Sequence, residues 1–131
     1  MGYAFAHPDV AELMNRVRQP FNVNHLAMVA ACAALDDGEF IARARSVNAQ
    51  GMEQLERGFR RLGLDSIPSR GNFITVRVPG AKSVYEKLLR DGVIVRPIAG
   101  YGLPDHLRVT IGLPEHNERF LAALGRAVAK A

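Results

Sequence analysis

The sequence contains no tryptophan, a single cysteine and only three lysines among 131 residues. One cysteine cannot form an internal disulfide, so the fold has no covalent staple. Cys32 lies in the apolar run from Ala27 to Leu35, where we expect a buried, reduced thiol and not a catalytic one. That run is too short to span a bilayer. Because no signal peptide is recognised either, we expect a cytoplasmic protein that does not bind membranes.

The residue patterns that usually mark a reaction centre are also missing. The four histidines, His7, His25, His106 and His116, are far apart, and Cys32 has no companion at metal-ligand spacing. No glycine-rich phosphate loop occurs, and no nucleophile stands next to an evident base. The sequence therefore predicts no metal site and no catalytic residue.

Positive charge is abundant but dispersed. The formal net charge is +4, and the cations are interleaved with 13 acidic residues. The densest group, Arg57, Arg60 and Arg61, falls on one predicted helix, where a solvated face is the usual explanation. No aromatic residues alternate with the cations to stack on bases. We therefore expect no nucleic-acid partner.

Two helices are predicted in the first 35 residues. Pro8, followed by acidic residues, is typical of a helix start, and this helix should reach about Arg18. The second helix, residues 25–35, is apolar almost all round, and Asn22 or Asn24 is expected to cap it. A helix of that kind needs cover on more than one side.

A longer helix is predicted from Asp36 or Asp37 to Leu62, with Gly63 as its terminator. Its apolar positions advance by three or four residues and form one continuous stripe. These positions are Phe40, Ala44, Val47, Gly51, Leu55, Phe59 and Leu62.

After Gly63 the pattern changes to short strands alternating with helices. The order is β-β-α-β-β-α, which predicts an α/β fold with a small mixed or antiparallel sheet and helices on one face. Two or three helices precede this unit. The predicted elements are strands at 64–68, 72–78, 93–96 and 107–111, and helices at 81–90 and 114–129.

Two arginines stand out because each adjoins apolar residues of a predicted strand. Arg96 ends the strand at 93–96, and Arg108 lies near the start of the strand at 107–111. The turn-rich stretch 98–104 between them would bring the strands side by side. Guanidinium groups match carboxylate and phosphate oxygens, so the pair is a candidate clamp for a doubly anionic small molecule. The alternative is a pair of ordinary strand arginines neutralised by surface carboxylates.

Several strings in the sequence resemble a known family. They are Gly2-Tyr3-Ala4 with His7-Pro8, Arg18-Gln19-Pro20-Phe21-Asn22-Val23-Asn24, Asn72-Phe73, Val95-Arg96-Pro97 and Leu107-Arg108-Val109-Thr110-Ile111-Gly112. In this order they resemble the carboxy-terminal part of the histidinol-phosphate aminotransferases, pyridoxal-phosphate enzymes of the class I and II aminotransferases. The resemblance covers essentially the whole chain.

The resemblance implies both a domain division and a reaction. Residues 36–131 would be the small carboxy-terminal domain, and residues 1–35 a remnant of the large domain. The parent reaction would transfer an amino group between glutamate and imidazole-acetol phosphate in histidine biosynthesis. Arg108 would bind the α-carboxylate of the small anionic substrate. Arg96 would contact the distal anion, either a phosphate or the side-chain carboxylate of glutamate.

The sequence departs from the family in its cofactor machinery. In the family, the lysine that binds pyridoxal phosphate lies upstream of the glycine matched by Gly2, and an arginine for the cofactor phosphate follows it. None of Lys82, Lys87 and Lys130 stands in a matching setting. We therefore expect this chain to bind no pyridoxal phosphate and to be inactive alone, as an excised fragment or the product of a truncated gene.

Two other functions remain open at this point. One is a stand-alone module that binds a small dianion without chemistry. The other is a fragment of a related pyridoxal-phosphate enzyme, such as a threonine-phosphate decarboxylase. By resemblance, the apolar segment 21–35 belongs near a dimer interface, so we also expect a homodimer. The alternative is that this segment folds back onto the helix at 37–62.

Overall fold

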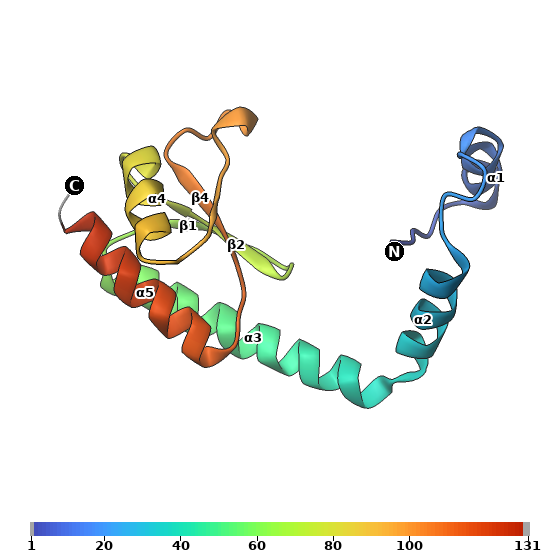
Figure 1. The fold of residues 1–131 in the computed structure, drawn as a ribbon, viewed down its shortest axis with the longest axis horizontal. Helices are drawn as coiled ribbons and strands as arrows, with labels where there is room; N and C mark the ends of the chain where they lie inside the picture. The colour runs from blue at the N-terminus through green and yellow to red at the C-terminus, as the bar shows by residue number, and fades with distance from the viewer. Residues whose placement is uncertain (1, 130–131) are drawn as a thin grey trace. The chain divides into compact units, whose positions relative to one another are not determined.

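The computed structural model describes residues 2–129, which form five α-helices, one short 3-10 helix and four strands (Figure 1). The chain divides into two units, one ending at Ala42 and one beginning at Arg43. The division falls inside a long helix.

The first unit contains the two predicted amino-terminal helices, α1 (Pro8–Val17) and α2 (His25–Asp36). His7 precedes α1, and its Nδ1 accepts a hydrogen bond from the Asp9 N–H at 3.4 Å. Of the two caps considered for α2, Asn24 is the one found, since its Oδ1 accepts from the Ala27 N–H at 2.8 Å. Both helix starts are therefore confirmed.

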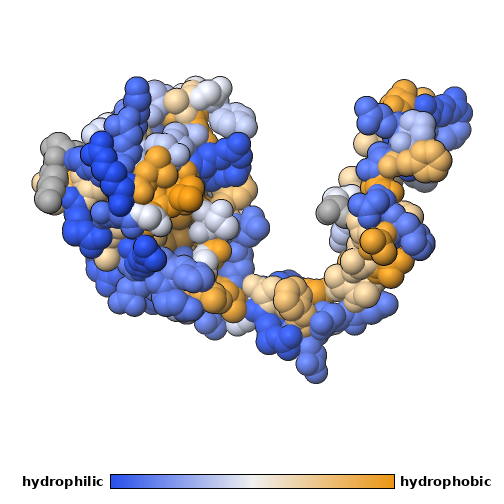
Figure 2. All heavy atoms as spheres, in the orientation of Figure 1, coloured by the Kyte–Doolittle hydropathy of each residue, from blue (hydrophilic) through white to orange (hydrophobic). Residues whose placement is uncertain are grey.

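The expected buried state of Cys32 is wrong. Cys32 is exposed, and α2 contains no buried residue. This helix is apolar on all sides, so exposed apolar surface runs along it (Figure 2), with Leu26 80% and Val29 55% exposed. A short apolar sequence run indicates which residues would gain stability from burial, but it does not show whether a partner surface is present to bury them.

The long helix α3 (Gly38–Arg61) begins after Asp37, whose Oδ1 accepts a hydrogen bond from the Phe40 N–H at 2.9 Å. The helix ends at Arg61, and Gly63, the predicted terminator, follows in the left-handed conformation at φ 68°. The predicted apolar stripe is present, but it is buried only from Gly51 onward. Phe40 and Val47, earlier on the stripe, are 57% and 37% exposed.

The second unit holds a four-stranded sheet in the order β1-β2-β4-β3, and every pairing is antiparallel. The α/β fold and the β-β-α-β-β-α order are confirmed, with the antiparallel form of the two sheets considered. A 3-10 helix, Ala99–Tyr101, occupies part of the predicted turn. The strands are β1 (Ser66–Ile67), β2 (Phe73–Arg77), β3 (Arg96–Pro97) and β4 (His106–Thr110).

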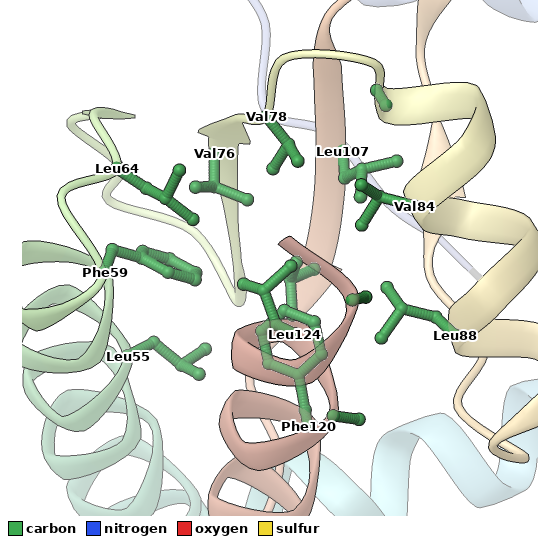
Figure 3. Packing of buried hydrophobic residues seen from close by; sticks show 14 of the residues in the cluster. Leu55, Phe59, Leu64, Val76, Val78, Val84, Leu88, Leu107, Phe120 and Leu124 are labelled. Carbon is green, nitrogen blue, oxygen red and sulfur yellow. The ribbon is translucent and has the colours of Figure 1, made fainter. Parts of the chain in front are cut away.

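Helices α4 (Ala81–Arg90) and α5 (Pro114–Val128) and the second half of α3 cover one face of this sheet (Figure 1). Alternate residues of β2 and β4 point into the core that these helices form, as strand geometry requires. Figure 3 shows the resulting packing. The hydrophobic core includes Leu55, Phe59, Ile74, Val76, Val84, Leu88, Leu107, Val109, Phe120 and Leu124.

The third predicted strand is displaced. It was expected at 93–96, but β3 begins at Arg96 and continues to Pro97. The reason lies at the end of α4, where the Val93 N–H donates to the Leu88 carbonyl at 2.9 Å and Gly92 adopts φ 70°. Val93 therefore belongs to the helix terminus, and Arg96 opens the strand instead of ending it.

Candidate functional site

Arg96 and Arg108 lie directly opposite each other on neighbouring antiparallel strands, β3 and β4. Residues at such positions place their side chains on the same face of a sheet, with Cβ atoms roughly 5 Å apart. The predicted approach of the two arginines is therefore present. Like charges at directly opposed positions destabilise a strand pair, and an arginine remains charged at any ordinary pH.

The two arginines project from the face of the sheet that α3, α4 and α5 do not cover. The strand register places the same-face neighbours of Arg108, and none of the residues on this open face is a carboxylate. Three are arginines. The open-face residues are Ile67, Phe73, Thr75, Arg77, Arg96, His106, Arg108 and Thr110.

Within residues 2–129, neither Arg96 nor Arg108 makes a side-chain hydrogen bond or an ion pair. Arg96 is exposed, whereas Arg108 is half-buried, with its Cζ 4.9 Å from the centroid of the Phe73 ring. The alternative of strand arginines neutralised by surface carboxylates therefore finds no support in the described structure. Two uncompensated cations remain at one place on the sheet.

A depression of about 520 Å³ surrounds this pair. Its volume is in the range of small-molecule sites. The depression is lined by Tyr85, Ile94, Val95, Arg96, Pro97, Arg108 and Thr110. Tyr85 and Thr110, which both carry hydroxyl groups, lie beside the two arginines in this lining.

Three neighbours of the pair were not predicted as site residues. Thr110 was detectable, because it lies two residues after Arg108 on the same strand and therefore on the same face. Phe73 required the register between β2 and β4, which sequence alone does not give. Tyr85 comes from α4, and no sequence signal connects it with the strands.

The two lysines within residues 2–129 do not line the depression at the arginine pair. Lys82 is exposed on α4, and Lys87 on the same helix donates from Nζ to the Ala127 carbonyl at 3.2 Å. Neither residue lines the depression, and Lys130 lies outside the described residues. Covalent binding of pyridoxal phosphate requires a lysine amine beside the substrate. The described part of the chain does not fit that requirement.

The described residues contain neither a metal-binding cluster nor a membrane-spanning helix. Over residues 2–129, no three histidine, cysteine or acidic side chains gather closely enough to hold a metal ion. No helix in that same range combines the length and apolar character needed to cross a membrane.

Comparison with known proteins gives a consistent result. Residues 1–124 match the family model for aminotransferase class I and II. The chain is 61% identical over 130 residues to histidinol-phosphate aminotransferase 2 of Pseudomonas aeruginosa, and 59% identical over 128 residues to histidinol-phosphate aminotransferase 1 of Dechloromonas aromatica. Each alignment covers 98% of this chain and 35% of the relative, so the chain spans about a third of these relatives' length.

Solved structures share the fold. A putative histidinol-phosphate aminotransferase from Erwinia carotovora atroseptica superposes with a TM-score of 0.83 over 95% of this chain and 36% of that one, at 24% identity. The histidinol-phosphate aminotransferase of Sinorhizobium meliloti, solved with pyridoxal-5'-phosphate, gives 0.79 over 94% and 35%, at 23% identity. With its family model, its sequence relatives and its fold in agreement, this chain belongs to the class I and II aminotransferases.

Proposed function

We propose that this chain is the substrate-recognising, carboxy-terminal part of a histidinol-phosphate aminotransferase. Arg108 binds the α-carboxylate of the amino-acid substrate, and Arg96 binds a distal anion, which is either the side-chain carboxylate of glutamate or the phosphate of histidinol phosphate. Residues 36–131 form the small domain, and residues 1–35 belong to the large one. The observation that carries this proposal is the directly opposed arginine pair, which within residues 2–129 has no side-chain partner and lies on a sheet face whose strand residues include no carboxylate.

A doubly anionic ligand suits this pair for an electrostatic reason. Opposed cations repel each other until an anion lies between or above them, so binding removes an unfavourable interaction as well as forming new ones. Each guanidinium group also offers several N–H donors in one plane, which match the two oxygens of a carboxylate or the oxygens of a phosphate. A substrate with an anion at each end can engage both arginines at once.

The cofactor chemistry is proposed to depend on residues outside this chain. Pyridoxal phosphate, when bound, supplies an electron sink for amino transfer, and its attachment needs an amine that Lys82 and Lys87 are not placed to offer. We therefore expect the purified chain to remain colourless with pyridoxal phosphate and to transfer no amino groups. A yellow adduct that borohydride fixes on one particular lysine would contradict this.

A chimaera tests the recognition role. Residues 1–131 replace the matching third of the Pseudomonas aeruginosa relative, and amino transfer between glutamate and imidazole-acetol phosphate is measured. Arg108→Ala should lower kcat/KM for every amino-acid substrate by a factor of about 30 to several thousand, corresponding to roughly 2–5 kcal/mol. Arg96→Ala should reduce turnover of substrates with a distal anion more than turnover of neutral ones.

Arg77→Ala is the matched control, because Arg77 shares the open face but does not line the depression. It should leave kcat/KM within about threefold of the chimaera, an effect below about 0.7 kcal/mol. Equal losses from all three alanine variants would indicate a general charge effect and would contradict the assigned roles.

The same arginine pair also supports a stand-alone module that binds a dianion without chemistry. An inactive chimaera combined with tight dianion binding by the chain itself would favour that function. Decarboxylation of threonine phosphate by the chimaera would instead favour the third possibility.

We further propose that the chain forms a homodimer through α2. Its large apolar side chains are exposed, and contiguous apolar surface of this kind usually marks a protein contact. A two-fold dimer would pair the same helix from two copies. The exposed residues are Leu26, Met28, Val29 and Leu35.

A further inference from the structure

We propose that Phe73 is a positioning residue for Arg108: its ring holds the guanidinium group in place and so raises the affinity of the site for the substrate carboxylate. This inference rests on the proposed function. It concerns a residue that touches no substrate and acts only through Arg108. Its basis is the short separation between the Arg108 Cζ and the centroid of the Phe73 ring, 4.9 Å.

The contact has the geometry of a cation–π interaction. A guanidinium group within about 6 Å of an aromatic centroid is attracted by the negative face of the ring. Phe73 and Arg108 lie diagonally across the β2–β4 pair, because Phe73 is opposite Thr110 and Arg108 is opposite Thr75. Diagonal neighbours on one face are within reach of aromatic and long side chains. The antiparallel register therefore creates this contact.

An aromatic ring has an advantage over a carboxylate in this position. A carboxylate would orient the guanidinium, but it would also neutralise its charge and occupy the N–H donors that the substrate needs. A phenyl ring offers no acceptor atom of that kind. The Arg108 side chain accordingly has a neighbour that restrains it, yet it makes no side-chain hydrogen bond or ion pair within residues 2–129.

The backbone of Phe73 is itself held from two sides. Its carbonyl accepts a hydrogen bond from the Ser69 Oγ at 2.6 Å, and the neighbouring Asn72 carbonyl accepts from the Ile111 N–H at 2.9 Å. The same turn is joined to α3, because Asn48 Nδ2 donates to the Gly71 carbonyl at 3.2 Å. These bonds fix the ring's point of attachment relative to β4, on which Arg108 stands.

Restraint of the Arg108 side chain in the free protein increases affinity, because less conformational entropy of that side chain is then lost on binding. Immobilising one long, rotamer-rich side chain on binding costs about 0.5–1.5 kcal/mol, which equals roughly a two- to tenfold change in dissociation constant. Loss of the ring should therefore weaken carboxylate binding by that factor. The loss should disappear when Arg108 is absent.

A double-substitution cycle on the purified chain tests this inference, with glutarate as the probe and NMR as the readout. When Arg108 is present, Phe73→Leu should raise the glutarate dissociation constant roughly two- to tenfold. In a chain that already carries Arg108→Ala, Phe73→Leu should leave the dissociation constant unchanged. Phe73→Tyr, which keeps the ring, should restore wild-type affinity. Ile67→Ala, which removes apolar surface from the same face away from Arg108, is the control and should change nothing.

A measurement without ligand gives an independent answer. The Arg108 Nε–Hε signal should move downfield in Phe73→Leu, because the shielding by the ring is lost, and should keep its position in Ile67→Ala. An unshifted signal, or an equal loss of affinity in the two Arg108 backgrounds, would overturn the role of Phe73 while leaving the proposed function intact. Failure of the unsubstituted chain to bind glutarate would overturn both.

Discussion

The side chain of Asn117 contacts both backbone groups of Gly112. The Gly112 N–H donates to Asn117 Oδ1 at 2.9 Å, and Asn117 Nδ2 donates to the Gly112 carbonyl at 3.0 Å. The same Nδ2 donates to Gln54 Oε1 on α3 at 3.1 Å. Asn117 is only 3% exposed, so these bonds join the end of β4, the start of α5 and α3 in a place that water barely reaches.

Asn117→Ala should therefore destabilise the chain strongly. Both Gly112 groups would lose their partner in a half-buried site, and each unsatisfied group costs about 1–3 kcal/mol. We expect a loss of roughly 2–4 kcal/mol in the free energy of unfolding, measured by urea denaturation. Gln50→Ala, on the exposed surface of α3, is the control and should change it by less than about 0.5 kcal/mol. A loss no larger than the control's would show that Gly112 finds another partner.

Gly51 is a second point of close approach. An alanine Cβ there would lie 2.5 Å from Ile111 Cγ2, 2.9 Å from Asn117 Nδ2 and 3.2 Å from the Gly112 carbonyl oxygen. Because a backbone atom is among these neighbours, the clash cannot be relieved by side-chain movement alone. Gly51→Ala should cost about 1–3 kcal/mol in spite of alanine's better helix propensity.

The matched control for Gly51 is Gly125 on α5, where the nearest atom to an added Cβ is Leu62 Cδ2 at 3.4 Å. That is ordinary contact. Gly125→Ala should stabilise the chain by up to about 1 kcal/mol through helix propensity. Thermal unfolding of each variant measures its change in stability. If both variants changed stability in the same direction, the packing described for Gly51 would be contradicted.

The opposed arginines should reduce the stability of the free chain. Arg96→Gln removes the like charge facing Arg108, so the free energy of unfolding should rise by about 0.2–1 kcal/mol at low salt. The gain should shrink in high salt, which screens the repulsion. Arg57→Gln is the control with the opposite sign, because Arg57 pairs with Glu53 at 3.0 Å and its loss should cost about 0.3–0.5 kcal/mol. A destabilising Arg96→Gln would show that no repulsion exists.

Association through α2 leads to a further prediction. A double variant, Leu26→Glu with Val29→Glu, should convert a dimer into a monomer, because four charges would then meet at the two-fold contact. Leu89→Glu, at an exposed leucine of α4, is the control and should leave the mass unchanged. Light scattering at tens of micromolar gives the mass directly. A monomeric unsubstituted chain without dye-accessible apolar surface would be evidence against the dimer.

Much of the fold was predictable because local signals agree with the packing. Single residues mark the helix boundaries through their own side chain or backbone preference. Helix starts are marked by Pro8, Asn24 and Asp37, and a helix terminus is marked by Gly63. The alternation and branched residues at 72–78 identified a strand, which is found as β2 (Phe73–Arg77). Such signals are local, so they do not depend on the elements that pack around them.

The errors arose where a partner surface or a neighbouring element decides the outcome. The run Val93–Val95 has strand-like side chains, but the end of α4 determines its backbone. Cys32 has apolar neighbours in sequence and no cover in the described structure. The arginine pair was visible in the sequence, whereas its contact with Phe73 depends on the register of β2 against β4.

The central claim is that Arg96 and Arg108 together bind a dianion, and comparing glutarate with butyrate tests it most directly. The purified chain is titrated with each, and the arginine Nε–Hε signals are followed by NMR. Glutarate should shift the signals of both arginines and bind at least about tenfold more tightly, since a second charge contact contributes roughly 1.5 kcal/mol or more. Butyrate should shift only Arg108. Equal affinities, or shifts equally large at Arg77, would contradict the claim.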